Sequence, residues 1–464
     1  MNPNIFREYD IRGIVEQDLT DATVAKLANA IGTFFVRNDA RRIAVGFDAR
    51  MSSPRFRDLL VRGLNQVGCD VLDVGRVPTP VLYFAVFTEE VDGGVMITGS
   101  HNPPDHNGFK ICLGKSTIFG EQIQAIKNIA LAEASIGGAN LFHRSEPFTH
   151  EQVKPKIQIA DVLQEYQRQL LRRVTVGEKP IKVVVDAGNG MGGVTAIPLY
   201  RALGYEIVEL FCEPDSDFPN HHPDPTVTEN LQDAIRAVKE NNADLAIAFD
   251  GDGDRIGVVD ENGRIIWGDE LMVLLSRAVL AEKPNATIIA EVKCSQKLFD
   301  DIAAHGGKPL MWKAGHSLIK AKMKETGAAL AGEMSGHIFF ADRFYGFDDA
   351  TYAGARLLEI LSKTNKTLSE LLADLPETFS TPELRVDCSE EKKFEIVAKI
   401  AEEFAKTNEV ITIDGARILF ENGWGLVRAS NTQAILVLRF EADTNENLVA
   451  IRETVESRVN YLIG

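Results

Sequence analysis

Short apolar runs alternate with helical patterns along most of the chain. Residues 43–47, Ile-Ala-Val-Gly-Phe, predict a buried strand. A helix is predicted next, with Ser53 as the N-cap and Pro54 at the first helical position, and its apolar residues recur at helical spacing until Gly68. Residues 71–74 predict the following strand. This order of strand, helix and strand predicts a mostly parallel α/β sheet.

The same order restarts twice. Residues 181–185 and 245–249 predict strands, and a third α/β stretch opens at residues 287–292. The polar residues 376–382 predict a linker. At roughly 100–200 residues per domain, the length suggests three or four domains. We place them at residues 1–148, 149–256, 257–372 and 373–464.

The last predicted domain has a different order of elements. A strand at 383–386 precedes a helix at 391–406, which carries Phe394, Val397, Ile400 and Phe404 on one face. Strands are predicted at 410–413, 416–420 and 434–440, before a final helix. Two helices with a largely antiparallel sheet, an α+β arrangement, suit this order.

The overall charge excludes some classes of partner. The formal net charge of −17 argues against nonspecific binding to nucleic acid or to an anionic membrane, although a local basic cleft could still bind an anionic substrate. The N-terminus has no apolar signal segment, and no apolar run reaches the roughly 18 residues of a membrane helix. Five scattered cysteines without a Cys-x-x-Cys pair predict reduced thiols and a cytoplasmic protein.

The first candidate for chemistry is the segment 98–110, which follows the apolar residues 95–97. Ser100 lies at a strand end between a glycine and a histidine, where its hydroxyl could act as a nucleophile or carry a phosphate. His101 and Lys110 could supply proton transfer or positive charge. A turn with an incidental serine explains the local pattern equally well.

The second candidate is a metal loop at Asp250, Asp252 and Asp254. Three carboxylates on a glycine-rich loop supply the hard oxygen ligands that Mg²⁺ and Ca²⁺ prefer. An EF-hand is the competing interpretation, because Glu261 falls at the twelfth position, but Arg255 occupies the sixth position, where glycine is required. A solvated acidic turn without metal is the other alternative. Three protein oxygens would leave room for a phosphate oxygen on the ion.

Two further clusters could bind a sugar phosphate. Glu333 and Ser335 alternate along one side of a loop and could bond vicinal sugar hydroxyls, although a capped turn is a common alternative. Residues 428–432 contain Arg428, Ser430, Asn431 and Thr432, which could cradle a phosphate. A polar turn before the next strand is as good an explanation of that cluster alone.

Together these four clusters resemble the α-D-phosphohexomutase family over essentially the whole chain, and within it the bacterial bifunctional phosphomannomutase/phosphoglucomutases. The matching strings are TGSHNPPDHNGFK from Thr98, DGDGDR from Asp250, GEMSGH from Gly332 and RASNT from Arg428. The resemblance implies a four-domain, heart-shaped α/β fold, with three related mixed α/β domains and a smaller, mobile C-terminal α+β domain. It also implies reversible conversion of hexose 1-phosphate and hexose 6-phosphate, with mannose or glucose as the sugar.

The resemblance assigns roles to particular residues. Ser100 would be the phosphoserine, and with Asp250, Asp252 and Asp254 it would hold one Mg²⁺. Glucose 1,6-bisphosphate would prime the serine and serve as an intermediate. Arg12, Lys110 and His337 are the candidates for the general base. The implied substrate-binding residues are Tyr9, Arg12, Arg255, Lys293, His316, Glu333, Ser335, His337, Arg428, Ser430, Asn431 and Thr432.

Three alternatives to this function stay open. A phosphoglucosamine mutase is the nearest, although Met334 and Gly253 fit the mannose/glucose enzymes better. A sugar phosphatase would release inorganic phosphate, and a non-catalytic sensor would bind without turnover. The expected partners are small-molecule hexose phosphates, with no nucleic acid, no membrane and a monomeric chain.

Overall fold

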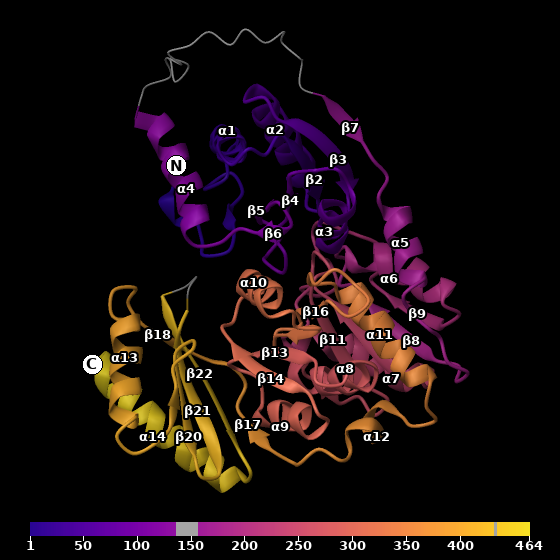
Figure 1. Ribbon diagram of the computed structural model, residues 1–464, viewed down its shortest axis with the longest axis vertical. Coiled ribbons are helices and arrows are strands. Elements are labelled where there is room, and N and C mark those ends of the chain that lie inside the picture. Colours follow the sequence, from indigo (N-terminus) through magenta and orange to yellow (C-terminus); the bar gives the residue numbers. More distant parts are fainter. Residues whose placement is uncertain (136–155, 431–433) are drawn as a thin grey trace. The chain divides into compact units, whose positions relative to one another are not determined.

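The computed structural model describes residues 1–135, 156–430 and 434–464 (Figure 1). The chain forms two compact units. The first unit contains residues 1–271 and 335–370, and the second contains residues 272–334 and 371–464. Each unit is therefore built from two separate segments of the chain.

The first unit contains a sheet with the strand order β1-β5-β4-β2-β3-β7, and β6 pairs with β5. The strands are β1 (Ile11–Ile14), β2 (Arg42–Phe47), β3 (Asp70–Arg76), β4 (Gly93–Ile97), β5 (His106–Leu113), β6 (Ser116–Thr117) and β7 (Ile157–Ile159). β2, β3, β4 and β7 run parallel, whereas β5 is antiparallel to β1, β4 and β6.

Helices cover both faces of this sheet. One core combines the strands with apolar side chains of α1 (Asp21–Arg37), α2 (Ser53–Gln66) and α4 (Glu121–Ser135). Val45 points into that core and its neighbour Ala44 does not, as alternation along a strand requires. α3 (Thr79–Thr88) contacts β2 and β4 from the opposite face. The N-cap of α2 is Ser52, and the predicted N-cap Ser53 is instead the first residue of the helix.

A second sheet in the first unit has the order β12-β11-β10-β8-β9. Its strands are β8 (Lys182–Asp186), β9 (Glu206–Leu210), β10 (Leu245–Phe249), β11 (Ile256–Asp260) and β12 (Ile265–Ile266), and its helices include α5 (Leu163–Leu171), α6 (Gly192–Ala202), α7 (Gln232–Asn241) and α11 (Ala350–Ser362). β8, β9 and β10 are parallel. The Tyr200 hydroxyl on α6 donates to the Thr351 carbonyl on α11, so residues 335–370 complete this part of the core.

The second unit begins with three parallel strands, β13 (Thr287–Glu291), β14 (Lys308–Trp312) and β15 (Leu330–Gly332), with α9 (Gln296–Ala304) and α10 (His316–Thr326). The remaining short or connecting elements of the described chain are η1 (Pro3–Ile5), η2 (Thr228–Leu231), α8 (Gly268–Glu282), α12 (Leu368–Leu372) and β16 (Ile338–Phe340).

The C-terminal part of the second unit is an antiparallel sheet with two helices, as the sequence predicts. The elements are β17 (Phe379–Ser380), β18 (Leu384–Asp387), α13 (Lys393–Phe404), β19 (Val410–Ile411), β20 (Ala416–Phe420), β21 (Gly423–Ala429), β22 (Ile435–Ala442) and α14 (Asn445–Ile463). β22 lies between β21 and the short strands β17 and β18.

Two sequence predictions in this part are wrong. Strand β21 was not predicted, because its two glycines interrupt the apolar alternation. Phe394 does not share the buried face of α13: it is 56% exposed, whereas Val397 and Ile400 are buried.

None of the helices in the described residues is long and apolar enough to cross a membrane. All five cysteines are free thiols, and four of them are buried.

Candidate active site

Ser100 lies directly beyond the carboxyl end of β4 and is 1% exposed. Its backbone has φ +50°, a left-handed conformation that costs a non-glycine residue about 1–3 kcal/mol and persists only where its surroundings hold it. The Ser100 amide donates to Thr98 Oγ1 at 2.8 Å. Its hydroxyl donates to Asp250 Oδ2 at 3.0 Å and lies 3.2 Å from His101 Nδ1. The serine loop and the acidic loop, 150 positions apart, therefore meet at the serine oxygen.

Asp250 begins the acidic loop at the carboxyl end of β10. Its Oδ1 accepts backbone hydrogen bonds from Gly253, Asp254 and Arg255 at 3.0 to 3.1 Å, so this one oxygen folds the loop around itself. A Cβ added at Gly251 would lie 2.4 Å from the Ser100 carbonyl oxygen. Glycine is thus needed where the two loops touch.

The three carboxylates fit a divalent cation. Asp250, Asp252 and Asp254 are all 0% exposed, and one oxygen from each lies within 4.8 Å of the others. Among the described atoms, Oδ1 of Asp252 and Oδ1 of Asp254 are buried and accept no hydrogen bond, and Asp254 Oδ1 has an ion-pair contact with His337. Buried hard oxygens that accept no hydrogen bond suit Mg²⁺ or a similar ion.

Lys110 on β5 provides a fixed positive charge beside these carboxylates. Its Nζ lies 2.7 Å from Asp252 Oδ2 and also bonds Asp254 Oδ2. Burial alone would lower the pKa of Lys110, but Asp252 and Asp254 outweigh it and raise the pKa above its ordinary value. In turn, burial would raise the pKa of Asp254, but Lys110 and His337 hold it well below its usual range. Lys110 is therefore held as a cation.

His101 lies among positive side chains. Removal from water lowers its pKa well below the ordinary value, and the charges of Arg255 and Arg12 lower it further. The neutral imidazole beside the Ser100 hydroxyl can accept a proton. Arg12 on β1 is half-buried, and its Nε donates to Asp10 Oδ2 at 2.6 Å.

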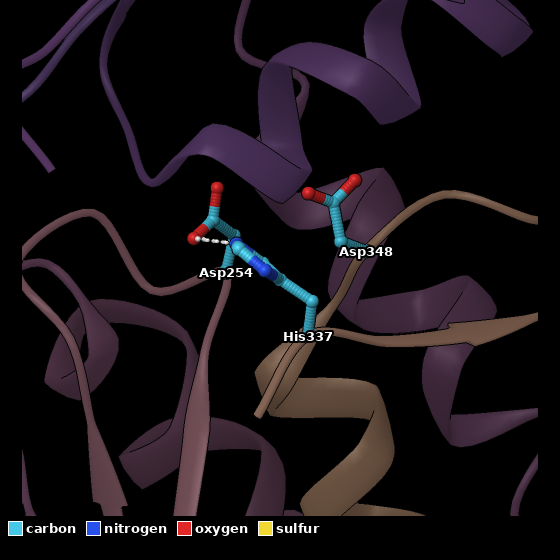
Figure 2. A group of neighbouring side chains, drawn as sticks. All are labelled: Asp254, His337 and Asp348. Carbon is cyan, nitrogen blue, oxygen red and sulfur yellow. Dashed lines mark ion pairs between the residues drawn. The ribbon is translucent and has the colours of Figure 1, made fainter. Parts of the chain in front are cut away.

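His337 forms a second group with two carboxylates, Asp254 and Asp348, in which Asp254 is shared with the metal loop (Figure 2). Figure 2 shows the imidazole pointing toward Asp254, whose Oδ1 lies 3.3 Å from His337 Nε2. His337 Nδ1 lies 3.3 Å from the Ser335 hydroxyl, and Nε of Arg255 is 3.3 Å from His337 Nε2. The first unit thus brings Ser335, His337 and Arg255 to the edge of the acidic loop.

The second unit holds five of the predicted substrate-binding residues: Lys293, His316, Glu333, Arg428 and Ser430. Lys293 follows β13, and its Nζ lies 3.1 Å from Glu383 Oε2 and 3.7 Å from Glu291 Oε1. Burial would lower the pKa of Lys293, but these two carboxylates raise it. Such a cation suits a sugar phosphate oxygen.

A network around Asp414 links three of these residues. Arg428 Nε donates to Asp414 Oδ2 at 2.6 Å, and the same oxygen accepts from the Ala314 amide at 3.0 Å. The next residue, Gly315, donates its amide to Glu333 Oε1 at 2.6 Å and caps the helix that His316 begins. Arg428, His316 and Glu333 are therefore held in one region of the second unit.

Four of the predicted substrate-binding residues lie in the segment from Arg428 to Thr432, and another is Tyr9. Arg428 lies on strand β21, since the sheet continues through Ala429, so the alternative of a polar turn is wrong for this residue. The Ser430 carbonyl accepts from buried Lys393 Nζ at 2.6 Å. Tyr9 is half-buried just before β1. Asn431 and Thr432 lie outside the described residues.

Several buried residues at these sites were not predicted. Thr79 at the start of α3 donates its hydroxyl to Asp252 Oδ2 at 2.5 Å. Arg417 donates to the carbonyls of Val292 and Cys294 at 2.7 and 2.9 Å, and Arg439 donates to that of Lys293. The Arg417 guanidinium stacks on Trp424, 3.8 Å from the ring centre. These arginines fix the backbone that carries Lys293. Arginine is usually read as an exposed residue, so the sequence gives little signal for them.

Four segments of the chain match the four domains of one protein family. Residues 3–136, 164–263 and 267–379 match "Phosphoglucomutase/phosphomannomutase, alpha/beta/alpha" domains I, II and III, and residues 383–457 match its C-terminal domain. The chain belongs to the phosphoglucomutase/phosphomannomutase family. This result confirms the predicted resemblance and the predicted α/β class with a smaller C-terminal domain; the domain boundaries placed from the sequence stay predictions.

Full-length relatives in the family are similar to this chain. A phosphomannomutase/phosphoglucomutase of Pseudomonas aeruginosa is 47% identical over 98% of this chain and 95% of its own length. A phosphoglucomutase of Neisseria gonorrhoeae is 46% identical over 99% of this chain and 96% of its own length. A crystal structure of a phosphoglucomutase/phosphomannomutase family protein from Burkholderia thailandensis is 42% identical, covers 100% of this chain and 98% of that one, and superposes with a TM-score of 0.90.

Proposed function

We propose that this chain interconverts hexose 1-phosphates and hexose 6-phosphates, with mannose and glucose as the sugars, through a phosphoserine at Ser100. One observation carries the assignment: the Ser100 hydroxyl bonds Asp250 Oδ2 at 3.0 Å, inside a buried group of three carboxylates. A nucleophilic oxygen beside a divalent-cation site is the arrangement that phosphoryl transfer needs. The names of the full-length relatives support the choice of sugars.

The proposed cycle has two transfers. The bond between phosphorus and Ser100 Oγ breaks while a bond forms to the free hydroxyl of the sugar phosphate, whose proton passes to a base. The product is a hexose 1,6-bisphosphate, which turns end for end and returns its other phosphate to Ser100. Glucose 1,6-bisphosphate would prime an unphosphorylated serine in the same way.

Each protein group has a task in this cycle. Ser100, Asp250, Asp252 and Asp254 would hold one Mg²⁺, which when bound stabilises charge on the transferring phosphoryl group. Lys110, held as a cation, adds fixed positive charge at the same place. His101 is the candidate base nearest the serine, because its Nδ1 lies 3.2 Å from the Ser100 hydroxyl. Arg12 and His337 remain alternative bases, whereas the raised pKa of Lys110 disfavours it.

The substrate-binding groups divide between the two units. Tyr9, Arg12, Arg255, Ser335 and His337 are the candidate sugar phosphate ligands of the first unit. Those of the second unit are Lys293, His316, Glu333, Arg428 and Ser430, of which Arg428 and its neighbours would grip the phosphate that is not reacting. A charge-assisted bond of this kind contributes about 1.5–3 kcal/mol. We also propose that the chain acts as a monomer in the cytoplasm.

The test is to follow mannose 1-phosphate and, separately, glucose 1-phosphate by ³¹P NMR with Mg²⁺ and a trace of glucose 1,6-bisphosphate. Both 6-phosphates should accumulate without free phosphate, and the Ser100→Ala variant should form neither. Free phosphate without isomer would make the chain a phosphatase, and no reaction with either sugar would direct the assay to glucosamine 1-phosphate. Wild-type activity in the Ser100→Ala variant would remove Ser100 from the mechanism.

A further inference from the structure

Arg50 lies beneath the serine loop and is 1% exposed. It follows β2 in the turn that leads to α2. Its Nη2 donates to the carbonyls of Ser100 and Asn102 at 2.8 and 2.5 Å. Its Nη1 donates to the His106 carbonyl at 2.9 Å and also to that of Pro103. One guanidinium thus gathers four backbone carbonyls of the segment that carries the candidate nucleophile.

Asp48 completes this anchor. Its Oδ2 lies 3.3 Å from Arg50 Nε and accepts from the Gly99 amide at 3.2 Å. Its Oδ1 accepts from the Arg50 amide at 3.0 Å and from the Ser53 hydroxyl at 2.5 Å. Asp48 therefore balances the buried charge of Arg50 and holds the serine loop by an N–H group, while Arg50 holds it by its carbonyls.

The serine loop needs such an anchor. Ser100 sits at φ +50°, and a left-handed serine relaxes unless other contacts fix it. Without Arg50 the carbonyl of buried Ser100 would lose this donor, which is unfavourable. A Cβ at Gly99 would lie 2.5 Å from the Arg50 guanidinium, so the glycine before the serine allows the close approach. Glycine in the sequence Thr-Gly-Ser is therefore needed to leave room for the Arg50 side chain as well as to form the turn.

We propose that Arg50 is a positioning residue for Ser100: it holds the serine loop so that Oγ stays directed at the carboxylates, and so decides whether the phosphoryl group passes to the sugar or to water. The inference rests on the proposed function of Ser100. In the competing step, a water oxygen attacks phosphorus, the bond to Ser100 Oγ breaks, the serine oxygen regains a proton, and inorganic phosphate leaves. A loosened loop favours that step because the transfer geometry is lost while the phosphoserine becomes open to water.

A lysine cannot reproduce this anchor. The planar guanidinium donates to four carbonyls through Nη1 and Nη2 and forms an ion pair with Asp48, whereas an ammonium is a compact charge with three donors. Arg50→Lys keeps the charge and removes the fork, and Arg50→Met removes both. The matched controls are Arg356→Lys and Arg356→Met. Arg356 is 2% exposed in the same unit, where it bonds Asp342 at 3.1 Å and lies over the Phe340 ring.

The experiment measures kcat, KM and the ratio of inorganic phosphate to isomer for all four variants. We expect Arg50→Lys to lower kcat about 100-fold, as a misplacement near 1 Å does, with KM within about threefold because a buried side chain touches no substrate. Arg50→Met should lower kcat further, and both variants should raise the phosphate ratio about tenfold or more. The Arg356 variants should lose thermal stability but keep kcat and the ratio. Equal kcat losses at both arginines, or a loss confined to KM, would overturn the proposal.

Two further measurements separate possible failures. Intact mass after mixing with glucose 1,6-bisphosphate reports phosphate on Ser100. No added phosphate on the wild type would sink the proposed function itself, whereas a phosphorylated wild type with an unaffected Arg50→Lys variant sinks only the role of Arg50. Should Arg50→Met fail to fold, amide hydrogen exchange of residues 99–106 in Arg50→Lys decides the matter. Exchange faster than in Arg356→Lys supports the anchor, and unchanged protection contradicts it.

Discussion

Two lysines that pair with carboxylates, one in each unit, differ in how their ion pairs are built. Lys110 in the first unit is 4% exposed and faces two carboxylates that are 0% exposed. Lys293 in the second unit is 13% exposed, and its closer partner, Glu383, is 24% exposed. In both cases the carboxylates raise the pKa of the lysine against the effect of burial.

The difference lies in what else each pair touches. The partners of Lys110 belong to a single loop that is already folded on Asp250 Oδ1, so the charges there are fixed before any ligand arrives. Glu383 stands at the end of the polar segment 376–382, and water reaches its pair with Lys293. Preorganised charge favours a transition state, whereas an exchangeable ion pair favours reversible binding of an anion. The two lysines are therefore expected to affect different kinetic constants.

The strongest test of this contrast is Lys110→Met. We expect kcat to fall about 10³-fold, because a fixed charge in a water-excluded site is lost. The variant also leaves Asp252 and Asp254 without their ammonium partner, a loss of about 3–5 kcal/mol for a buried pair. Thermal unfolding should therefore depend more steeply on Mg²⁺ than in the wild type. A kcat within tenfold of the wild-type value would break the comparison.

The next largest effect is expected from Gly251→Ala. The new Cβ would meet the Ser100 carbonyl at 2.4 Å and push the two loops apart, which should lower kcat about 100-fold with little change in KM. Gly306→Ala, with no atom within 4 Å of its Cβ, is the control and should alter stability only. If both alanines leave kcat unchanged, contact between the loops is not needed for turnover.

Lys293→Met should instead act on binding. We expect KM to rise about tenfold, which corresponds to about 1.4 kcal/mol, while kcat changes less than threefold. Glu383→Gln removes the competing carboxylate and should lower KM slightly. If KM is unchanged in both variants, or if the main loss is in kcat, Lys293 and Lys110 do not differ in the kinetic constant that they affect.

The last prediction concerns stability and not turnover, and rests on the buried carboxyl of Asp349. Burial raises the pKa of Asp349 to about 7, while Tyr166 and the Tyr352 amide donate to its oxygens. An unfolded aspartate has a pKa of about 3.9. The folded state therefore binds the extra proton, and the contribution to stability is complete below about pH 4 and is lost as the pH rises toward 7.

Asp349→Asn should remove this dependence. Between pH 5 and 7 the wild type should lose up to about 3 kcal/mol more stability than the variant, since each pKa unit corresponds to about 1.4 kcal/mol. Thermal unfolding of both proteins at the two pH values measures the difference. Parallel curves would show that Asp349 is ionised in the folded protein.

The sequence predicted the elements that carry the reaction better than the contacts that support them. Strand β10 was predicted with its observed bounds, because five consecutive apolar residues end in a charged one. Ser100 and Asp250 follow strands of two different sheets, so their pairing was predicted from the family resemblance and not from the order of strands in one sheet. The three carboxylates of the acidic loop form a pattern that is visible in the sequence without knowledge of the fold.

The supporting contacts depend on burial, which a sequence does not state. Arg50 and Thr79 each follow a predicted strand, and that position was the one available signal for them. Strand β21, which carries Arg428, was not predicted because its two glycines interrupt the apolar alternation. Arg417 stacks on Trp424, seven positions along the chain, only because β20 and β21 pair.

Because each unit contains two separate segments of the chain, the order of synthesis determines when each unit can finish folding. The first unit takes residues 335–370 for its core, through contacts such as Tyr200 with Thr351, so it cannot finish folding when residue 271 leaves the ribosome. About 100 more residues must emerge first, which takes roughly 5–20 s at common rates of translation. During that interval the apolar face of α6 stays uncovered, because α11 has not yet been synthesised. A nascent chain arrested between residues 271 and 370 should therefore bind chaperones through both units, and one arrested soon after residue 370 through the second unit alone, which still lacks residues 371–464.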